Sequence, residues 1–495
     1  MTTPTHRDPP DRSMLDLRLA PAALAVWVVA LALVRAPAWC AVATAGAAAV
    51  ALVLLRALGT STSRLSLTLL CGAVVLVALS TGGRVAARES GGLREAARDG
   101  ATVELRGTVR SVTALASGAP GTARVVVALD ATRADGDDPW TATGAAVQMF
   151  IPDAPALGSR IELTARLAPS RSASDRALAT ARPLGEIRVR AGPDPVTALL
   201  ADRRVALVDI AAALPGDAGA LIPAVAVGDM SAVGELDAIM RASGLAHLTA
   251  VSGAHFSMVG VVVLALSSWC GVPRRWRWSP VVIVSVGFVM LVGPGPTVVR
   301  AALMGGVGVL GVGVGRPSRA VPALCASVLT LLVADPWLCA DLGFLLSVVA
   351  TAGITLLAGP LAGRLGSALP RTVAMALAVP VAAQAACAPV ILLIDPAVPL
   401  YAIPANIVVA PAVGPATIGG LCAAMLAGWC PWAADWAAAV AGTGCWWIGA
   451  VARVAVALPG ARVSWLAGWP GLLTLATATG TGLALLLRCR RAMAP

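Results

Sequence analysis

The chain has no lysine, so all 37 of its basic residues are arginine. It has only three histidines and contains neither a CxxC pair nor a cluster of histidines with carboxylates, which leaves no ligand set for a metal ion. The ten cysteines all fall in or beside hydrophobic segments, where they serve as small apolar residues. No GxxxxGK[ST] motif is present, so no nucleotide site is predicted, and neither a metal nor another cofactor is expected.

Acidic residues are scarce in the second half of the chain. Residues 81–244 carry 18 arginines and 19 acidic residues, whereas residues 245–495 carry 13 arginines and only four aspartates. This surplus of positive charge favours contact with anionic lipid or, alternatively, with a polyanionic substrate. Because 58% of the residues are apolar, the mean hydropathy is +0.82, and stretches long enough to cross about 30 Å of hydrocarbon recur, a soluble globular fold is excluded.

Apolar segments predict a polytopic α-helical membrane protein with about 12 helices. Several segments contain glycine or proline and are candidates for re-entrant helices. The first is expected to be a retained helix and not a signal peptide, because no small-residue cleavage site follows it, and the third is short for a full span. The segments cover residues 18–34, 38–58, 65–80, 245–270, 279–293, 297–315, 320–334, 340–359, 372–394, 400–428, 433–457 and 464–487.

Between residues 101 and 191 the pattern changes to short alternating strands separated by Gly, Pro, Asp and Ser. Five such strands predict a small OB-like β-barrel. Trp140 and Phe150 are its only aromatic residues and its net charge is +2, so a packing or positioning role is as well supported as binding of a nucleic acid. The strands cover residues 103–110, 123–129, 145–151, 160–167 and 186–190.

Charged residues interrupt apolar positions at helical spacing over residues 196–243, which predicts amphipathic helices along the membrane surface. The predicted organisation then has six parts. They are a cytoplasmic N-terminus (1–17), N-terminal transmembrane helices (18–80), an extracytoplasmic OB-like domain (81–195), amphipathic interfacial helices (196–244), a second transmembrane region (245–487) and a cytoplasmic tail (488–495).

The distribution of arginine in short loops predicts the orientation in the plasma (inner) membrane. Arg274, Arg275 and Arg277 follow the first span of the second region and belong in the cytoplasm. This placement requires the β domain to lie outside and the two termini to lie in the cytoplasm. If every segment crosses the membrane, Arg453 and Arg462 are exceptions to the rule.

Two of the three histidines lie in the sequence His247-Leu-Thr-Ala-Val-Ser-Gly-Ala-His255, at the start of a long apolar run. Polar groups are costly in lipid, so this segment is the first candidate for a functional centre. On a helix His247, Ser252 and His255 share one side, and Gly253 lets helices approach closely or lets the helix break. A pore or helix-contact role is favoured over a Ser–His nucleophile pair, because no carboxylate is nearby to orient the histidine.

Arg300 follows a cluster of glycine and proline and stands at the start of an apolar helix. An arginine there needs water, an acid or a passing anion, unless it extends to the interface. Asp335 and Asp341 are its candidate partners or, alternatively, helix caps in an outer loop. Gln384 and Asn406 lie in other apolar helices, where each lines a cavity or bonds to a neighbouring helix.

Four motifs in order resemble those of the ComEC-type competence proteins, the inner-membrane channels that carry single-stranded DNA into transformable bacteria. They are HLTAVSGAH at 247–255, PTVVRAALM at 296–304, DPW at 335–337 with DLGFLLS at 341–347, and NIVVAP at 406–411. The resemblance covers nearly the whole chain, including Gly228-Asp229 and the outer OB-like domain.

The chain also departs from this family pattern. The usual GFQLSF is GFLLSV at residues 343–348, so Leu345 replaces a polar group near the expected centre. Many members carry a C-terminal metallo-β-lactamase-like domain, whereas this chain has no HxHxDH motif. The nuclease is therefore expected to be a separate protein.

The resemblance implies that residues 245–487 form a channel for single-stranded DNA, without enzymatic activity of its own. A DNA receptor, a nuclease and a cytoplasmic motor are the expected separate partners, and homo-oligomerisation is left open. A transporter of a smaller anion and an intramembrane enzyme that uses Ser252 and His255 are the alternatives. The polar core of the channel is expected to consist of His247, Ser252, Gly253, His255, Arg300, Asp335, Asp341, Gln384 and Asn406.

Overall fold

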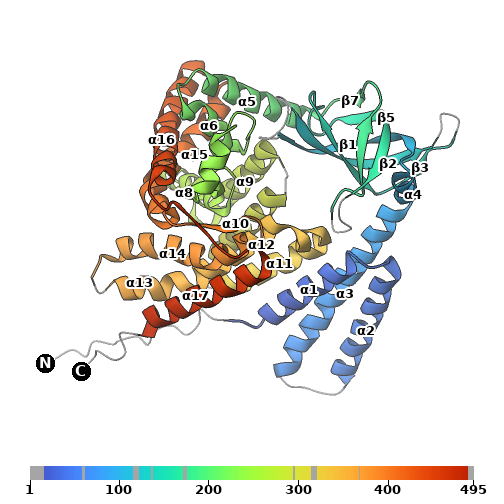
Figure 1. Cartoon of the computed structure of the whole chain (residues 1–495), viewed down its shortest axis with the longest axis horizontal. Coiled ribbons are helices and arrows are strands. Elements are labelled where there is room, and N and C mark those ends of the chain that lie inside the picture. The colour runs from blue at the N-terminus through green and yellow to red at the C-terminus, as the bar shows by residue number, and fades with distance from the viewer. Residues whose placement is uncertain are drawn as a thin grey trace.

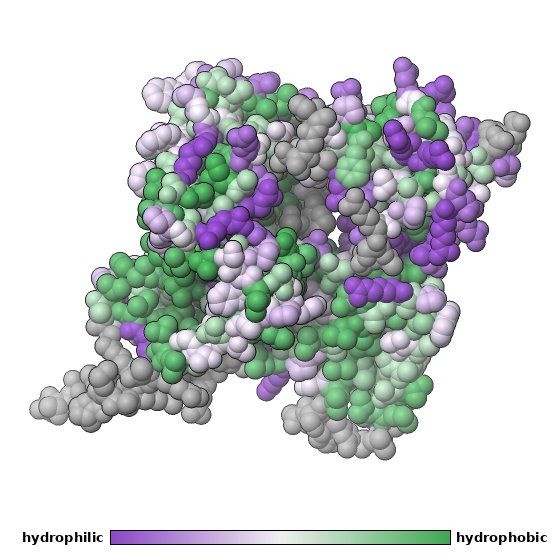
Figure 2. Space-filling model, in the orientation of Figure 1, coloured by the Kyte–Doolittle hydropathy of each residue, from purple (hydrophilic) through white to green (hydrophobic). Residues whose placement is uncertain are grey.

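The described part of the chain forms two groups of helices and one β domain (Figure 1). Three N-terminal helices lead up to the β domain, and the helices after it form the larger group. Hydrophobic residues cover the N-terminal helices, whereas hydrophilic residues gather on the β domain (Figure 2). A computed structural model describes residues 16–57, 62–114, 122–134, 138–170, 175–293, 296–313, 320–366 and 368–488.

The N-terminal helices are α1 (Ala20–Leu33), α2 (Ala38–Ala57) and α3 (Thr62–Glu89). The prediction that the third segment is short was wrong, because Ser66–Glu89 provides 24 helical residues with a mean hydropathy of 1.9. The helix continues past its apolar run because its polar side chains find partners. The Ser80 hydroxyl donates to the Val333 carbonyl and the Thr81 hydroxyl to the Val77 carbonyl, each at 2.6 Å.

A closed five-stranded barrel forms the β domain. Around the barrel the strands run β1–β2–β4–β6–β5 and return to β1, with β4 and β6 parallel and the other pairs antiparallel. This order is that of an OB-like barrel, as the sequence predicts. Alternate residues point into its core, as period-2 strands require. The strands are β1 (Thr102–Ala114), β2 (Ala123–Arg133), β4 (Ala146–Ile151), β5 (Arg160–Pro169) and β6 (Ala179–Pro183).

The strand that closes the barrel differs from the one predicted. The fifth predicted strand corresponds to β7 (Arg188–Ala191), which pairs with β5 outside the barrel, and a two-residue strand β3 (Thr141–Ala142) pairs with β2. β6 was missed because Ala-Thr-Ala-Arg-Pro has only one β-branched residue and ends in proline. At the bulge of β1, Gly107 is required because any Cβ there would collide with the Ala128 carbonyl.

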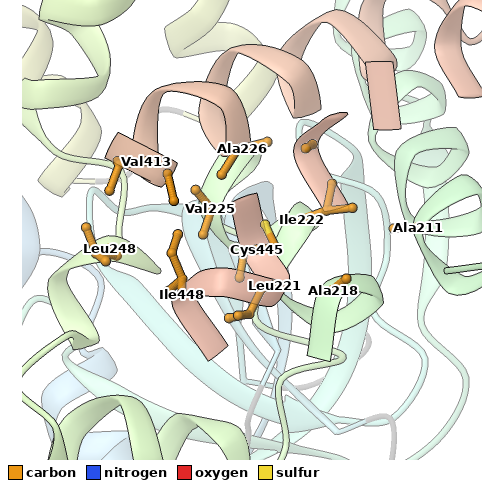
Figure 3. Close-up of a cluster of buried hydrophobic side chains, with 14 of the residues drawn as sticks. Ala211, Ala218, Leu221, Ile222, Val225, Ala226, Leu248, Val413, Cys445 and Ile448 are labelled. Carbon is orange, nitrogen blue, oxygen red and sulfur yellow. The ribbon is translucent and has the colours of Figure 1, made fainter. Parts of the chain in front are cut away.

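Three helices follow the barrel: α5 (Pro195–Ala212), α6 (Asp217–Val227) and α7 (Leu236–Ala242), with the short α4 (Leu93–Arg98) before it. The prediction of surface amphipathic helices is wrong for α6, because every residue from Leu221 to Val227 is buried. Its side chains pack against Val413 of α15 and Cys445 and Ile448 of α16 in the largest apolar cluster (Figure 3). The α6 sequence contains no charged residue after Asp217, which permits this burial.

Each of the nine apolar segments predicted beyond residue 245 contains a helix. By length and composition, eight helices among the described residues can cross a membrane, and four shorter apolar helices accompany them. The fold is therefore that of a polytopic α-helical membrane protein with an OB-like β domain. The helices are α8 (Gly253–Trp269), α9 (Trp278–Val292), α10 (Pro296–Gly313), α11 (Ala320–Ala334), α12 (Leu342–Gly353), α13 (Gly359–Leu365), α14 (Arg371–Ile391), α15 (Ala402–Leu426), α16 (Pro431–Ala457) and α17 (Gly468–Arg488).

Short elements connect these helices. A π-helical turn joins α12 to α13, and two three-residue strands, β8 and β9, pair with each other. The connecting elements are η2 (Ala246–Leu248), η3 (Arg274–Trp276), η4 (Pro336–Ala340), η5 (Ile354–Ala358), β8 (Ala397–Pro399) and β9 (Arg462–Ser464).

Candidate functional site

The segment from Gly244 to His255 is a folded connection and not part of a continuous helix. The 3-10 turn η2 contains His247, and α8 begins only at Gly253. The prediction that His247, Ser252 and His255 share one side of a helix is therefore wrong, because the chain turns between His247 and Ser252. Of the two roles predicted for Gly253, the structure shows the helix break. A Cβ at Gly253 would meet no described atom within 4 Å, so this glycine permits no close approach.

Ser252 and His255 cap the start of α8 for each other. The Ser252 N–H donates to Nδ1 of His255 at 3.0 Å, and the Ser252 hydroxyl is also 3.0 Å from Nδ1. Since Nδ1 accepts the backbone hydrogen bond, the neutral imidazole carries its proton on Nε2. This arrangement is that of a capping box, and it uses the nitrogen that a Ser–His nucleophile pair would need as a base.

His255 extends from this cap into the protein interior. The residue is only 1% exposed, and its Nε2 is buried with no hydrogen-bond partner among the described residues. The backbone of Val225 in α6 is close enough to form a weak hydrogen bond with the ring, and the His247 side chain is close enough to act on it electrostatically. The buried Nε2–H is therefore directed at the backbone of α6, where it lacks a well-formed hydrogen bond.

Asn406 joins α15 to the same segment through Gly244. Its side-chain amide donates to the Gly244 carbonyl at 3.4 Å and to the Ala402 carbonyl at 2.8 Å. His247 also interacts with the Gly244 backbone. Gly244 has a φ of +77°, and a Cβ there would lie 2.5 Å from the Ala402 Cβ, so only glycine fits. Gly244 is thus the contact that brings His247 and Asn406 together.

Arg300 and Asp341 form a second polar group. The Arg300 side chain is 8% exposed, and its Nη1 is 3.9 Å from Oδ1 of Asp341. Asp341 also caps α12 by accepting from the Phe344 N–H, and the guanidinium lies 5.8 Å from the centre of the Phe344 ring. Both predicted roles of Asp341, cap and partner, are therefore present. The Nε and Nη1 atoms of Arg300 have no hydrogen-bond partner among the described residues, so this buried cation is only partly compensated.

Asp335 does not contact Arg300 but pairs with the β domain. Its carboxylate is 3.2 Å from Nη1 of Arg176, in the connection before β6. Beside this pair, the Arg88 guanidinium at the end of α3 donates to the Asp175 carbonyl at 2.8 Å and lies 5.4 Å from the Trp337 ring. Trp337 belongs to η4, so this contact fixes the β domain to both helical groups. We call these residues, Arg88, Asp175, Arg176, Asp335 and Trp337, the β-domain joint.

The predicted site residues therefore fall into separate places. His247, Ser252, His255 and Asn406 form one polar group, and Arg300 with Asp341 forms another. The apolar cluster between them contains Phe256 of α8 and Ala301 of α10. Gln384 lies half-buried within α14, a helix that packs against α12 and α13, and belongs to neither group.

The aromatic residues of the β domain differ in availability. The Trp140 ring is covered by two guanidinium groups, those of Arg106 at 4.2 Å and Arg133 at 4.9 Å. Phe150 is 48% exposed and is paired in register with Arg124 of β2. Only Phe150 therefore offers a free face for stacking beside a positive charge.

Sequence reasoning missed several residues of these groups. Arg176 lies in a polar loop like many other arginines, and nothing local indicates a partner 159 residues away in Asp335. Gly244 carried a usable signal, because it ends a predicted helix just before the first motif, where glycine at positive φ is common. Phe344 belongs to the third motif, but its place beside Arg300 depends on how α10 and α12 pack.

Comparisons with known proteins concern the part of the chain that holds these groups. A sequence model of the family described as Competence protein matches residues 226–491, more than half of the 495 residues. ComE operon protein 3 from Bacillus subtilis (strain 168) is 33% identical over 135 residues, which are 27% of this chain and 17% of that protein. The alignment thus spans about a sixth of that relative's length. No solved structure matches the chain.

Proposed function

The chain belongs to the competence protein family, and we propose from this membership that it provides the path by which single-stranded DNA crosses the plasma membrane in natural transformation. The observation that carries the proposal is Arg300. Its buried guanidinium lies within the matched region, is only partly paired with Asp341 at 3.9 Å, and keeps Nε and Nη1 without partners among the described residues. A passing phosphate would supply the missing hydrogen bonds.

The charge balance supports a polyanionic substrate. Residues 245–495 contain 13 arginines and four aspartates, and two of those aspartates are already occupied by Arg176 and Arg462. A path for a strand of phosphates needs a positive potential, which this surplus supplies. The channel is proposed to be no enzyme, in keeping with the occupation of Nδ1 of His255 by a backbone N–H.

The β domain is proposed to lie outside the cell, with the N- and C-termini in the cytoplasm. Phe150 and Arg124 would then face the incoming strand, one as a stacking surface and the other as a phosphate contact. A DNA receptor on the outer side, a separate nuclease and a cytoplasmic motor are the proposed partners, because the chain has neither a P-loop nor an HxHxDH motif.

Deletion and complementation test this function. Labelled duplex DNA is supplied to competent cells that lack the gene, and DNase-protected label and transformants are measured before and after return of the full chain. We expect the chain to restore both, with the protected label recovered as single strands. Unchanged uptake in the deletion strain would contradict the proposal.

The same strains separate a DNA path from a transporter of a smaller anion. Uptake of radiolabelled phosphate and nucleoside monophosphates is measured in parallel with DNA uptake. The proposal predicts that only DNA uptake depends on the gene. Saturable uptake of a small anion that requires the chain, together with normal transformation without it, would favour the transporter.

A further inference from the structure

Trp27, in the first helix, contacts the segment that leads into Asp341. α1 packs against α3 and α11 (Figure 1), and the Trp27 indole N–H donates to the Cys339 carbonyl of η4 at 2.9 Å. Cys339 stands two residues before Asp341, which lies at the junction of η4 and α12. A side chain 312 positions earlier in the sequence therefore holds the backbone just before this junction.

The Trp27 ring also contacts the residue whose N–H is capped by Asp341. It stacks on the Phe344 ring, with the ring centres 4.7 Å apart and the planes inclined by 21°. Phe344 is fully buried, and its N–H donates to Oδ1 of Asp341. Trp27 thus holds the chain on both sides of Asp341, on one side through a backbone carbonyl and on the other through an aromatic ring.

These contacts affect the Arg300–Asp341 pair directly. The Asp341 oxygen that accepts from the Phe344 N–H, Oδ1, is the same oxygen that lies 3.9 Å from Nη1 of Arg300. At this distance the carboxylate attracts the guanidinium but forms no hydrogen bond with it, since an N–H···O bond needs about 3.2 Å or less. The Arg300 guanidinium also lies 5.8 Å from the centre of the Phe344 ring. The position of Oδ1 therefore sets how much of Arg300 stays available to a ligand.

The N-terminal helices support this connection at further points. The Ser80 hydroxyl of α3 donates to the Val333 carbonyl, three residues before η4 begins. The Arg88 guanidinium, at the end of the same helix, lies 5.4 Å from the ring of Trp337 in η4. The chain from the end of α11 to the start of α12 is thus held by α1 and α3, although both helices precede the region matched by the family model.

We propose that Trp27 is a positioning residue for the Arg300–Asp341 pair. It fixes η4 and Phe344 so that Asp341 compensates the buried Arg300 without closing on it, which leaves the guanidinium available to a phosphate. Without Trp27, Asp341 can approach Arg300 and compete with the phosphate for the same N–H groups. The role toward phosphate rests on the proposed function, whereas the coupling between Trp27 and the pair does not.

A spectroscopic measurement tests this coupling without DNA. The full chain is labelled with fluorotryptophan and placed in lipid nanodiscs, and the fluorine resonance of Trp27 is identified as the one that is lost in Trp27→Phe. Arg300→Gln and Asp341→Asn should each shift this resonance, because both residues contact Phe344. Arg371→Gln, at an exposed position, should leave it in place. A Trp27 resonance that stays in place in either of the first two variants would overturn the proposal.

DNA uptake by the deletion strain tests the role of Trp27 in the site. At matched membrane levels Trp27→Leu, which removes both the ring stack and the N–H donor, should lower uptake at least about fivefold, the lower end of typical coupling between sites. Trp27→Phe keeps an aromatic ring and should recover part of this loss. The control is Trp39→Leu, which alters a tryptophan of α2 that is 70% exposed and should leave uptake unchanged.

A second background separates positioning from a general loss of stability. In a chain that carries Arg300→Gln, Trp27→Leu should cause no further loss of uptake, because the pair that it positions is already removed. Val26→Ala alters a fully buried neighbour in α1 and should lower uptake by the same factor in both backgrounds, which shows that a further loss is measurable. Equal factors for Trp27→Leu in the two backgrounds would overturn the proposal. If Arg300→Gln itself leaves uptake unchanged, the proposed function fails, and the fluorine shifts still decide whether Trp27 is coupled to the pair.

Discussion

The carboxylate of Asp335 lies 3.2 Å from the guanidinium of Arg176, so the β domain is joined to the connection that leads into Asp341. Asp341 in turn faces the buried Arg300. A single short element, η4, therefore lies between the β-domain contact and this charge pair. The Arg176 side chain is 57% exposed, which makes the ion pair itself weak.

Arg88 is expected to hold the β-domain joint more strongly than Arg176. Its guanidinium is buried and donates to the Asp175 carbonyl, and such hydrogen bonds contribute about 1.5–3 kcal/mol. Arg88→Met should lower the free energy of unfolding by about 2 kcal/mol, and Arg176→Met by less than about 1 kcal/mol. Chemical unfolding in detergent, followed by hydrogen exchange in η4, measures both. Equal effects of the two changes would argue against this ranking.

Alanine substitutions at Gly244 and Gly253 provide a matched test of the contacts around the first motif. Gly244→Ala places a Cβ 2.5 Å from that of Ala402 at a φ of +77°, so a loss of about 2–4 kcal/mol in stability is expected. Gly253→Ala meets open space at the first position of α8 and should change stability by less than about 1 kcal/mol. Thermal unfolding and membrane levels of the two variants test this difference in stability. A Gly244→Ala variant as stable as wild type would show that this contact is misplaced.

The two residues of the α8 cap should respond differently to alanine. Ser252→Ala keeps the backbone N–H that donates to Nδ1 of His255 and is expected to cost about 1 kcal/mol, with DNA uptake retained. His255→Ala removes a buried side chain and its cap, so it should cost about 2–3 kcal/mol. Melting temperature and uptake at matched membrane levels test this order. Complete loss of uptake in a stable Ser252→Ala variant would instead support a nucleophile.

Low pH is expected to destabilise the β domain, because it protonates the Glu162 carboxylate. Hydrogen bonds from Arg190, and then from Arg106, hold the pKa of the Glu162 carboxyl below its usual value, although burial acts in the opposite direction. A depressed folded pKa means that this stabilisation is present above the unfolded pKa, about 4.3, and is lost as the pH falls through the folded value. The protection factors of the β5 and β7 amides in the full chain, which correct for the slower intrinsic exchange in acid, should therefore fall below about pH 4.

Glu162→Gln removes that dependence, whereas Glu186→Gln, at an exposed position without this network, is the control. In the Glu162→Gln variant β5 and β7 should exchange faster at neutral pH and respond less to acid. The same acid profile in wild type and Glu162→Gln would contradict the assignment.

The fold was largely predictable from the sequence because two kinds of local pattern are strong. Apolar runs mark the membrane helices, and alternation marks β1, β2, β4 and β5. β6 was missed because its strand character comes from its neighbours β4 and β5 and not from its own residues. α6 was placed at the surface because its charged neighbours obscured an apolar stretch that α15 and α16 enclose.

The sequence predicts individual candidate residues for the site but not how they lie relative to one another. The motifs marked His255, Arg300 and Asp341, yet the partner of Asp335 is Arg176, far away in the chain. The orientation in the membrane stays a prediction, because the length and hydropathy of a helix show only that it can cross.

The most direct test of the central claim, that Arg300 binds the phosphates of a passing strand, is the uptake of labelled DNA by the deletion strain carrying Arg300→Gln. Arg371→Gln, which alters an exposed arginine at the start of α14, is the matched control, and Arg300→Lys keeps the charge. At equal membrane levels, Arg300→Gln should lower uptake at least about tenfold, equivalent to about 1.4 kcal/mol. Uptake by the Arg300→Lys variant should lie between that of Arg300→Gln and that of wild type, and uptake by Arg371→Gln should equal that of wild type. Full uptake by Arg300→Gln at wild-type membrane levels would contradict the account.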